Sequence, residues 1–212
     1  MDVLDAIRHR RAVREYRADP VPTSLLRELV EAASWAPSAM NGQSWRFVVV
    51  TNGELLNNIS QNSKRWVLNN QPSLVGNEQM RSLLNNPQYQ VLHNAPALIA
   101  IATPIDTRWN AEGCALAAEN VMLAATALGL GSCWIGLAED WLNTSECLKA
   151  LGLAETDRII APIIVGYPRG LLQPVTRNQP NIWIGAGEKL IEDGGHGELP
   201  AKPGFYGSLI HP

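Results

Sequence analysis

The densest group of charged side chains in the sequence is a cluster of arginines near its start. Five of the 17 lysines and arginines fall within ten positions, in the run Arg8-His9-Arg10-Arg11-Ala12-Val13-Arg14 and at Arg17. Each guanidinium group can make two parallel hydrogen bonds to phosphate oxygens, so this cluster could bind a phosphorylated ligand. The alternative is a structural role, because arginines at the C-terminal end of a helix are stabilised by its dipole and commonly face water.

A polar loop further along could supply hydrogen bonds to the edge of a ring. The stretch from Ala36 to Arg46 contains Ser38, Asn41 and Gln43. Their side chains offer both donors and acceptors, which a ring carrying N–H and C=O groups requires. The alternative is an ordinary connection between a helix and a strand, which uses Ser, Asn and Gly for their backbone dihedrals.

A glycine-rich segment runs from Gly129 to Gly136 with the sequence Gly-Leu-Gly-Ser-Cys-Trp-Ile-Gly. It does not fit the dinucleotide fingerprint, because its third glycine is misplaced and it follows a helix instead of opening one after a strand. Its small residues could let backbone amides approach a flat ligand closely. The sequence holds no phosphate P-loop and no Gly-x-Ser-x-Gly elbow, so the usual parts of nucleotide hydrolases and serine hydrolases are missing.

Apolar periodicity indicates the elements that would position these motifs. Asp2 is expected to cap a first helix that carries Val3, Leu4 and Ile7 on one face. Few strands among helices, without regular alternation, predict an α+β domain. Pro162 removes one ladder hydrogen bond, which predicts an edge position or a bulge for its strand. Four further helices are expected: one capped by Thr23 and ending at Ala36, a short one around 55–59, an alanine-rich central one over 111–128 ended by glycines, and one opened by a capping box of Asn143 and Glu146. The expected strands cover residues 47–50, 97–102, 132–135 and 159–165.

Two stretches of the chain show little periodicity. Residues 60–93 are rich in Asn and Gln and contain Pro72 and Pro87, which predicts a mobile excursion or lid. Residues 169–212 are expected to form an extended tail. Apolar residues such as Trp183 make this tail a poor candidate for full solvation, so we expect it to dock on a second subunit. The length of the chain predicts one domain over residues 1–212.

Composition argues against several classes of function. A formal net charge of -3 is a poor match for a polyanion, so no nucleic-acid partner is expected. The longest apolar runs, 95–102 and 159–165, are far shorter than the roughly 20 residues that span a bilayer, and the first residues lack signal-peptide features. We therefore expect no membrane partner and a cytoplasmic location. Three widely spaced cysteines and four scattered histidines match neither a disulfide framework nor a metal site, so no metal is expected.

The order of the motifs is more specific than any one of them. Ile-x-x-Arg-Arg-x-x-Arg-x-Tyr is followed by Ala-Pro-Ser-x-x-Asn-x-Gln-x-Trp-x-Phe, then by the alanine-rich helix and the glycine-rich segment, then by Ile-Val-Gly-Tyr-Pro. This series resembles the nitroreductase family of flavoproteins over roughly residues 2–183. The resemblance implies a central, mainly antiparallel sheet of about four to five strands flanked by helices, in an intertwined homodimer.

The resemblance also implies a cofactor and the residues that bind it. FMN would be held non-covalently at the interface between the two subunits. Arg10 and Arg11 would contact its phosphate and ribityl chain, and Arg14 would lie nearer the pyrimidine edge of the ring. The other implied cofactor-binding positions are Pro37, Ser38, Ala39, Asn41 and Gln43, in a loop reaching in from the partner subunit, and Cys133, Trp134, Ile135 and Gly136, a segment along the flavin where a backbone amide faces N5.

Some positions in the implied site are less direct matches to the family pattern. A basic residue after the Gly-Tyr-Pro turn usually completes the phosphate site, which implies Arg177, with Arg169 as the alternative. Ala12, in the implied cofactor-binding set, stands where a hydroxyl residue is common, and Ser44 replaces the frequent proline before Trp45. The first departure would remove one phosphate hydrogen bond, worth about 1 kcal/mol.

The reaction implied by the resemblance is a two-electron transfer from NADH or NADPH through flavin N5 to a small electron-poor acceptor such as a nitroaromatic or a quinone. The kinetics would be ping-pong, with Arg14 stabilising negative charge near N1 and with no protein nucleophile or metal.

Three alternatives stay open at the level of sequence. The protein could run another flavin reaction of the same fold (dehalogenation, ene reduction, dehydrogenation or flavin fragmentation), it could bind or sense FMN without turnover, or it could be structural with solvated arginines.

Overall fold

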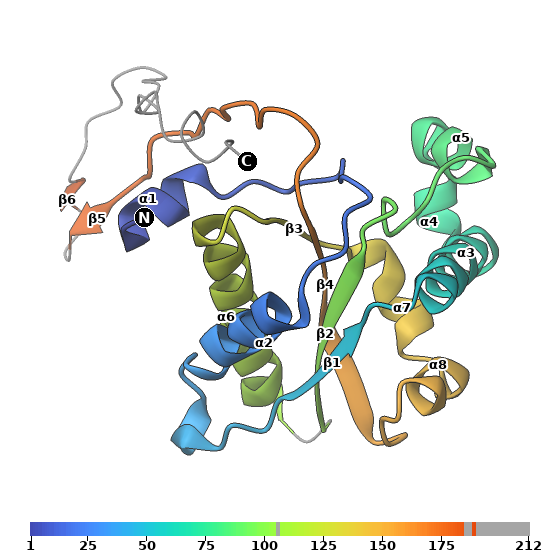
Figure 1. Ribbon diagram of the computed structural model, residues 1–212, viewed down its shortest axis with the longest axis horizontal. Helices are drawn as coiled ribbons and strands as arrows, with labels where there is room; N and C mark the ends of the chain where they lie inside the picture. The colour runs from blue at the N-terminus through green and yellow to red at the C-terminus, as the bar shows by residue number, and fades with distance from the viewer. Residues whose placement is uncertain (105–106, 185–187, 190–212) are drawn as a thin grey trace. The chain divides into compact units, whose positions relative to one another are not determined.

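The computed structural model describes residues 1–104, 107–184 and 188–189. Contacts divide the chain into two units, residues 1–170 and residues 171–212. The first unit is an α+β structure built on one antiparallel sheet with the strand order β1-β2-β4-β3 (Figure 1), which confirms the expected fold class. Its strands are β1 (Arg46–Val50), β2 (Ala97–Pro104), β3 (Gly131–Trp134) and β4 (Asp157–Gly166).

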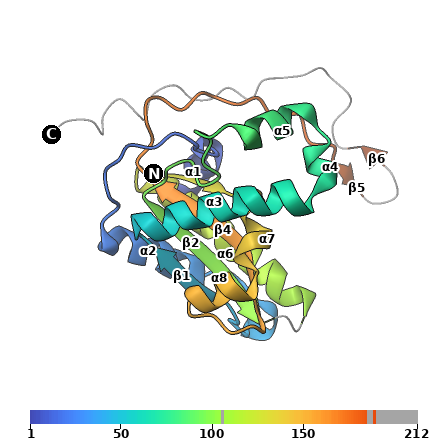
Figure 2. The same ribbon diagram turned by 90° about the vertical axis from the view of Figure 1, so that its right-hand side faces the viewer.

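Helices cover both faces of this sheet. Because side chains alternate along a strand, Ile99 and Ile101 of β2 point to one face and Leu98 and Ala100 to the other, and all four side chains are fully buried. The first face packs against α2 (Thr23–Ser34) and α6 (Arg108–Ala127). Helices α3 (Gly53–Asn70), α7 (Glu139–Leu142) and α8 (Ser145–Ala150) lie on the other side of the sheet (Figures 1 and 2).

The alanine-rich segment forms the central helix that its composition predicts. Small side chains let α6 approach both the sheet and α2 closely, and the residues that are wholly buried there are Cys114, Ala117, Ala118, Val121 and Ala125. The helix begins at Arg108, three residues earlier than expected, and its end is followed by Gly129 at a φ of +74°. This left-handed conformation favours glycine, so the expected stop at this glycine is confirmed.

Pro162 lies in an interior strand, so its expected position at a sheet edge is wrong. β4 pairs with β2 on one side and with β3 on the other. Pro162 lies opposite Ala100, and its carbonyl accepts a hydrogen bond from the N–H of Ile135 at 2.9 Å. The pairing register shifts nearby, between Ile101 and Ala102, and passes over Ile160. The bulge, the other expected outcome, is therefore present nearby. The proline itself is tolerated because it faces Ile135, just beyond the end of β3, whose carbonyl accepts from the N–H of Ala138 at 3.1 Å and so needs no donor at position 162.

Most of the Asn-rich stretch 60–93 is helical, although its sequence shows little periodicity, and its interpretation as a mobile excursion or lid stays a prediction. The expected short helix around 55–59 is the start of an 18-residue helix. Asn52 caps it by accepting a hydrogen bond from the N–H of Leu55 at 2.9 Å. Leu56, Ile59 and Val67 are buried at helical spacing, a sparse pattern that the polar residues obscure. The helices of this stretch are α3, α4 (Pro72–Val75) and α5 (Glu78–Asn85).

Of the three expected helix caps, one is confirmed and two are wrong. The carboxylate of Asp2 accepts a hydrogen bond from the N–H of Asp5 at 2.9 Å and opens α1 (Val3–His9). Helix α2 begins at Thr23 itself, after Pro22, without a side-chain cap. Helix α8 is capped by Thr144.

Asn143 is used for a different purpose than the expected cap. Its side-chain amide donates to the carbonyl of Ile159 at 2.9 Å and accepts from the N–H of Ile159 at 2.7 Å. One side chain therefore replaces a ladder partner for β4 and ties the α7–α8 connection to the sheet.

The second unit has little regular structure in its described part. Residues 171–182 form neither helix nor strand, as expected for the tail. The two-residue strands β5 (Trp183–Ile184) and β6 (Glu188–Lys189) pair antiparallel. Residues 185–187 and 190–212 of the tail lie outside the described residues, and its docking on a second subunit stays a prediction, as does a single domain over residues 1–212.

Candidate functional site

The arginine-rich segment and the glycine-rich segment lie side by side at the edge of the sheet. Ala12 forms a parallel bridge with Ser132 of β3, and the N–H of Val13 donates to the carbonyl of Ser132 at 3.0 Å. Four residues further along, Tyr16 forms an antiparallel β-bridge with Pro168, which follows the end of β4. The segment around residues 12–17 thus extends the sheet past its edge strand, and two motifs more than 100 positions apart in the sequence meet there.

Gly131 makes this close approach possible. A Cβ atom at Gly131 would lie 2.7 to 2.8 Å from three side-chain carbons of Val13, a separation that folded proteins do not tolerate. Gly166 has the same role one strand further in, where an added Cβ would lie 2.8 Å from the ring of Tyr16 and 2.6 Å from Pro96. The glycines therefore permit contact between backbone and side chains at both points.

Three arginines of the cluster, those implied to bind the cofactor, have different surroundings. Arg14 is exposed and forms no ion pair with any carboxylate in the described part of the chain. Arg10 is mostly buried, and its Nε lies 3.4 Å from Oε1 of Glu119 on α6. Arg11 turns back on the chain, where its Nη1 donates to the carbonyl of Arg8 at 2.6 Å and to its neighbour's carbonyl at 2.8 Å. Arg14 is therefore the one of these three cations with the fewest internal interactions.

The positive charges of the cluster act on Cys133. Burial raises the pKa of the Cys133 thiol, while the charges of Arg14 and Arg10 lower it by a smaller amount. The net rise keeps the sulfur protonated near neutral pH. Cys133 is therefore a small apolar surface of the site and not a nucleophile.

Residues 89–93 belong to the same neighbourhood, although no specific role was expected for them. Burial raises the pKa of Tyr89, and the charge of Arg14 lowers it in part. Burial also lowers the pKa of His93, and the charge of Arg14 lowers it further. The two rings meet edge to face with centroids 5.9 Å apart. A tyrosine and a histidine four positions apart, just before a buried strand, are the signal in the sequence that could have suggested this pair.

The polar loop 37–43 lies away from the arginine cluster of its own chain. Figure 1 shows the α2–β1 connection at the opposite end of the sheet from residues 10–17. The loop is a tight structure: the hydroxyl of Ser38 accepts from the N–H of Gln43 at 3.1 Å, and Asn41 and Gln43 have φ values of 53° and 47°. Pro37, Ala39, Met40 and Asn41 are exposed. One chain alone does not bring this loop to the arginines.

The two basic candidates after the Gly-Tyr-Pro turn are placed differently. The N–H of Arg169 donates to the carbonyl of Glu15 at 2.9 Å, so its backbone lies beside the residue that follows Arg14. Arg177 is exposed in the second unit, and its role stays a prediction.

The end of β3 offers a backbone donor. Within the described residues, the N–H of Gly136 has no hydrogen-bond acceptor, and a Cβ added at this glycine would meet nothing within 4 Å. An accessible N–H, an exposed guanidinium group and a strand edge made of small residues could bind an anionic ligand that carries a flat ring with acceptor atoms.

The described residues contain neither a membrane-spanning helix nor a cluster of metal ligands. Each helix in that part of the chain is too short or too polar to span a bilayer. No group of three or more His, Cys, Asp or Glu residues gathers there as metal ligands would.

The fold and the site define an α+β protein with a basic site, rich in hydrogen-bond donors, at the edge of an antiparallel sheet. The family model described as the nitroreductase family matches residues 7–167, and the chain belongs to this family. The resemblance inferred from the order of the motifs is therefore confirmed.

Three similar proteins illustrate the relationship. A nitroreductase of Bacteroides fragilis, whose crystal structure contains bound FMN, is 29% identical, with a TM-score of 0.77 over 87% of this chain and 98% of that one. A Thermus thermophilus protein named NADH dehydrogenase is 58% identical over 50 residues, which are 24% of each chain. A nitrobenzene nitroreductase of Ectopseudomonas oleovorans is 43% identical over 47 residues, 22% of this chain and 21% of that one. The matched segments thus span about a quarter or less of those last two relatives.

Proposed function

We propose that this oxidoreductase of the nitroreductase family binds FMN and transfers two electrons from NADH or NADPH to a small electron-poor acceptor, such as a nitroaromatic or a quinone. The observation that carries the proposal is the pairing of the segment that carries Arg14 with β3 at the sheet edge, where the charge of Arg14 acts on Cys133. The FMN in the Bacteroides fragilis structure and the names of the other two relatives support it.

The residues at this edge fit the chemical groups of FMN. A phosphorylated isoalloxazine needs cations at one end and hydrogen-bond donors near its ring. Arg14 and Arg10 supply the cations, and the N–H of Gly136 is a donor without an acceptor among the described residues. Arg11, Ala12, Trp134 at the end of β3 and Ile135 directly after it complete the surface that would hold the cofactor.

Bound FMN would supply the hydride chemistry that no side chain here can perform. The protein's own contribution is binding and electrostatics. Arg14 provides positive charge where negative charge develops. Cys133 remains a thiol because burial raises its pKa, so the strand edge stays uncharged and no covalent intermediate is expected.

The site is proposed to be completed by a second copy of the chain. The loop that carries Pro37, Ser38, Ala39, Asn41 and Gln43 is exposed and lies away from its own arginine cluster. The apolar face of α1 is also uncovered, with Val3, Leu4 and Ile7 between 51% and 65% exposed. Such a face fits burial against another subunit. In the proposed homodimer each loop reaches the cofactor of its partner.

The cofactor proposal is tested by FMN titration. Arg14→Met keeps the length of the side chain and removes its charge, and it should weaken FMN binding about 10- to 100-fold, the usual effect of losing a hydrogen bond to a charged group. Arg65→Met is the matched control, because Arg65 is exposed on α3 and forms no ion pair with the described carboxylates. Failure of the unaltered protein to bind FMN would contradict the proposal.

The acceptor is tested on the FMN-loaded protein by following NADH and NADPH oxidation with 4-nitrobenzoate and with menadione. Reduction of either acceptor is the expected result. A yellow protein that oxidises neither nucleotide would instead be a flavin-binding protein without turnover.

A further inference from the structure

Lys64 on α3 is a buried amine with an unusual set of partners. It is 9% exposed, and no carboxylate among the described residues pairs with it. Its Nζ instead donates to the carbonyls of Asn86 at 2.5 Å and Tyr89 at 3.3 Å. Because burying an ammonium group is costly unless its hydrogen bonds are made, these contacts hold the turn after α5 against α3.

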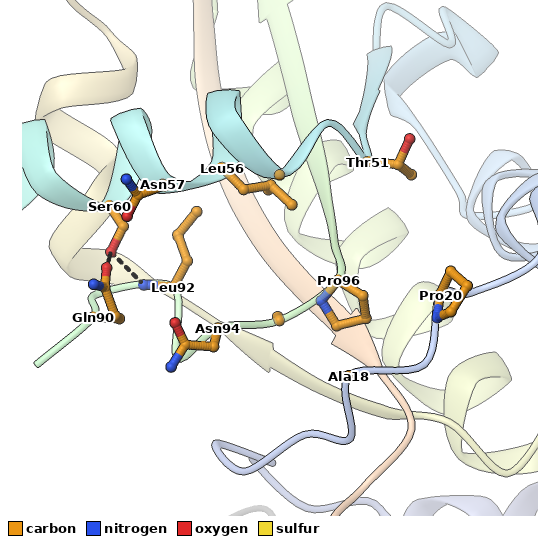
Figure 3. A pocket seen from close by; sticks show the side chains of 12 residues that line it. Ala18, Pro20, Thr51, Leu56, Asn57, Ser60, Gln90, Leu92, Asn94 and Pro96 are labelled. Atoms are coloured by element: carbon orange, nitrogen blue, oxygen red, sulfur yellow. Dashed lines mark hydrogen bonds between the residues drawn. The ribbon is translucent and has the colours of Figure 1, made fainter. Parts of the chain in front are cut away.

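Ser60, one helical turn before Lys64, holds the next part of the same segment. Its hydroxyl donates to Oε1 of Gln90 at 2.9 Å and accepts from the N–H of Leu92 at 3.3 Å (Figure 3). Gln61 donates to the same oxygen of Gln90 at 3.1 Å. Lys64 and Ser60 together fasten residues 86–92 to α3, and we call this set of hydrogen bonds the α3 clamp.

The α3 clamp determines where Tyr89 and His93 lie. Both side chains are half-buried, their rings meet edge to face at 83°, and the charge of Arg14 acts on both. His93 and the residue after it have φ values of 51° and 54°, a strained conformation that persists only when neighbouring contacts enforce it. Close packing of Tyr16 and Pro96 over Gly166 brings the two segments together.

We propose that Tyr89 and His93 form a wall of the acceptor-binding site, that they recognise the oxygen atoms of a nitro or quinone group, and that Lys64 positions this wall. The proposal rests on the proposed function, because it names which groups of this chain meet the acceptor. Tyr89 and His93 are candidate specificity residues, and Lys64 is a positioning residue that does not itself contact the acceptor.

The chemistry of the wall suits such an acceptor. The phenol of Tyr89 stays protonated because burial raises its pKa, and the imidazole of His93 stays neutral near pH 7 because burial and Arg14 lower its pKa. Each group can therefore donate a hydrogen bond to an oxygen of the acceptor, and the paired rings offer an apolar edge to a flat aromatic molecule.

The test measures binding without turnover. The oxidised FMN-loaded protein is titrated with 4-nitrobenzoate in the absence of NADH, and binding is followed through the visible spectrum of the flavin. Tyr89→Phe and His93→Gln should each raise the Kd for 4-nitrobenzoate about 3- to 10-fold, the usual effect of losing one hydrogen bond, and should leave the Kd for FMN within about 2-fold. Tyr167→Phe is the control for loss of a phenol hydroxyl, because the ring of Tyr167 is half-buried between the core and the guanidinium group of Arg17 and is not part of the proposed wall.

Lys64→Met tests the positioning role, with Lys149→Met on the exposed side of α8 as its control. We expect Lys64→Met to raise the Kd for 4-nitrobenzoate and to make residues 86–94 susceptible to limited proteolysis, while thermal unfolding stays cooperative.

The outcomes separate this proposal from the function on which it rests. If the unaltered protein binds no FMN, the proposed function fails and this proposal falls with it. If the unaltered protein binds FMN and 4-nitrobenzoate but Tyr89→Phe and His93→Gln bind both with unchanged Kd, the wall proposal alone is overturned. A parallel loss of FMN in both variants would also overturn it, because these residues would then bind the cofactor and not the acceptor.

Discussion

At the scale of single residues, burial and neighbouring charge set the protonation states near the site. His93 is half-buried, its ring contacts Tyr89, and the charge of Arg14 acts on it. Both burial and Arg14 disfavour the imidazolium form, so the pKa of His93 is lower in the folded protein than the value of about 6.5 expected in the unfolded chain.

The lowered pKa of His93 predicts a dependence of stability on pH. Below pH 6.5 the unfolded chain takes up a proton at this position more readily than the folded protein, so the free energy of unfolding should fall as the pH is lowered from 7 to 5. His93→Gln removes the titrating group and should reduce the slope of the free energy of unfolding against pH. Urea unfolding at a series of pH values measures it, and identical slopes for the two proteins would show that His93 is not desolvated as described.

Part of the candidate site could be predicted from residue types alone. The arginine cluster and the glycine-rich segment are recognisable because their side chains are unusual in number or kind, and the structure places them together. The exact use of single polar residues depends on partners distant in sequence. Asn143 bonds to Ile159 although it precedes a helix like a cap, and Lys64 bonds to carbonyls of a turn more than 20 positions away.

At the scale of elements, the addition of residues 12–17 to β3 is what creates the site. The contact depends on the absence of a side chain at Gly131, since a Cβ there would lie 2.7 Å from a carbon of Val13. Val13 is buried and β-branched, so it has little freedom to move aside. The segment that carries Arg14 is thus held in place through one close packing contact.

Gly131→Ala should therefore destabilise the protein by about 1 to 3 kcal/mol through overpacking, and it should also weaken FMN binding, because Val13 is next to Arg14. Chemical denaturation and FMN titration measure the two effects. Gly53→Ala is the control, because a Cβ at Gly53 meets nothing within 4 Å and should change stability by less than about 0.5 kcal/mol. Equal stability of the two variants would mean that Val13 adjusts freely.

The elements themselves were predictable to different degrees. The apolar strands and α6 follow from continuous or helical burial patterns, and they are close to their expected bounds. α3 was missed over most of its length because its buried residues include Ser60, Ser63 and Lys64, which do not register as a hydrophobic stripe. The interior position of β4 was missed because Pro162 lies beyond the end of β3, where the carbonyl of Ile135 bonds to the N–H of Ala138 and no donor at position 162 is needed.

At the scale of the whole molecule, the implied cofactor residues form two groups that one chain keeps apart. The arginine cluster meets the end of β3, whereas the loop 37–43 lies at the other end of the sheet (Figure 1). Sequence reasoning could place both groups in one site only through the resemblance to a dimeric family, because spacing along the chain carries no information about a second copy. The proposed homodimer makes each site from the arginines of one chain and the loop of the other.

Such shared sites predict complementation between two defective chains. One chain carries Arg14→Met, and the other carries Asn41→Ala with Gln43→Ala in the loop. Each homodimer should bind FMN weakly. If the two chains are co-expressed at equal amounts and pair at random, half of the dimers are mixed, and in each mixed dimer one site has native arginines and a native loop. About one quarter of all sites should then bind FMN with the affinity of the unaltered protein.

The control for this complementation pairs two chains altered on the same side, Arg14→Met with Arg10→Met. Every site in a mixed dimer then contains one altered arginine, so no tight site should be restored. FMN titration of the co-expressed proteins distinguishes the two cases, because a tight phase is expected only for the arginine and loop pair. If the loop served the site of its own chain, or if the protein stayed monomeric, neither combination would produce that phase, and the shared site would be refuted.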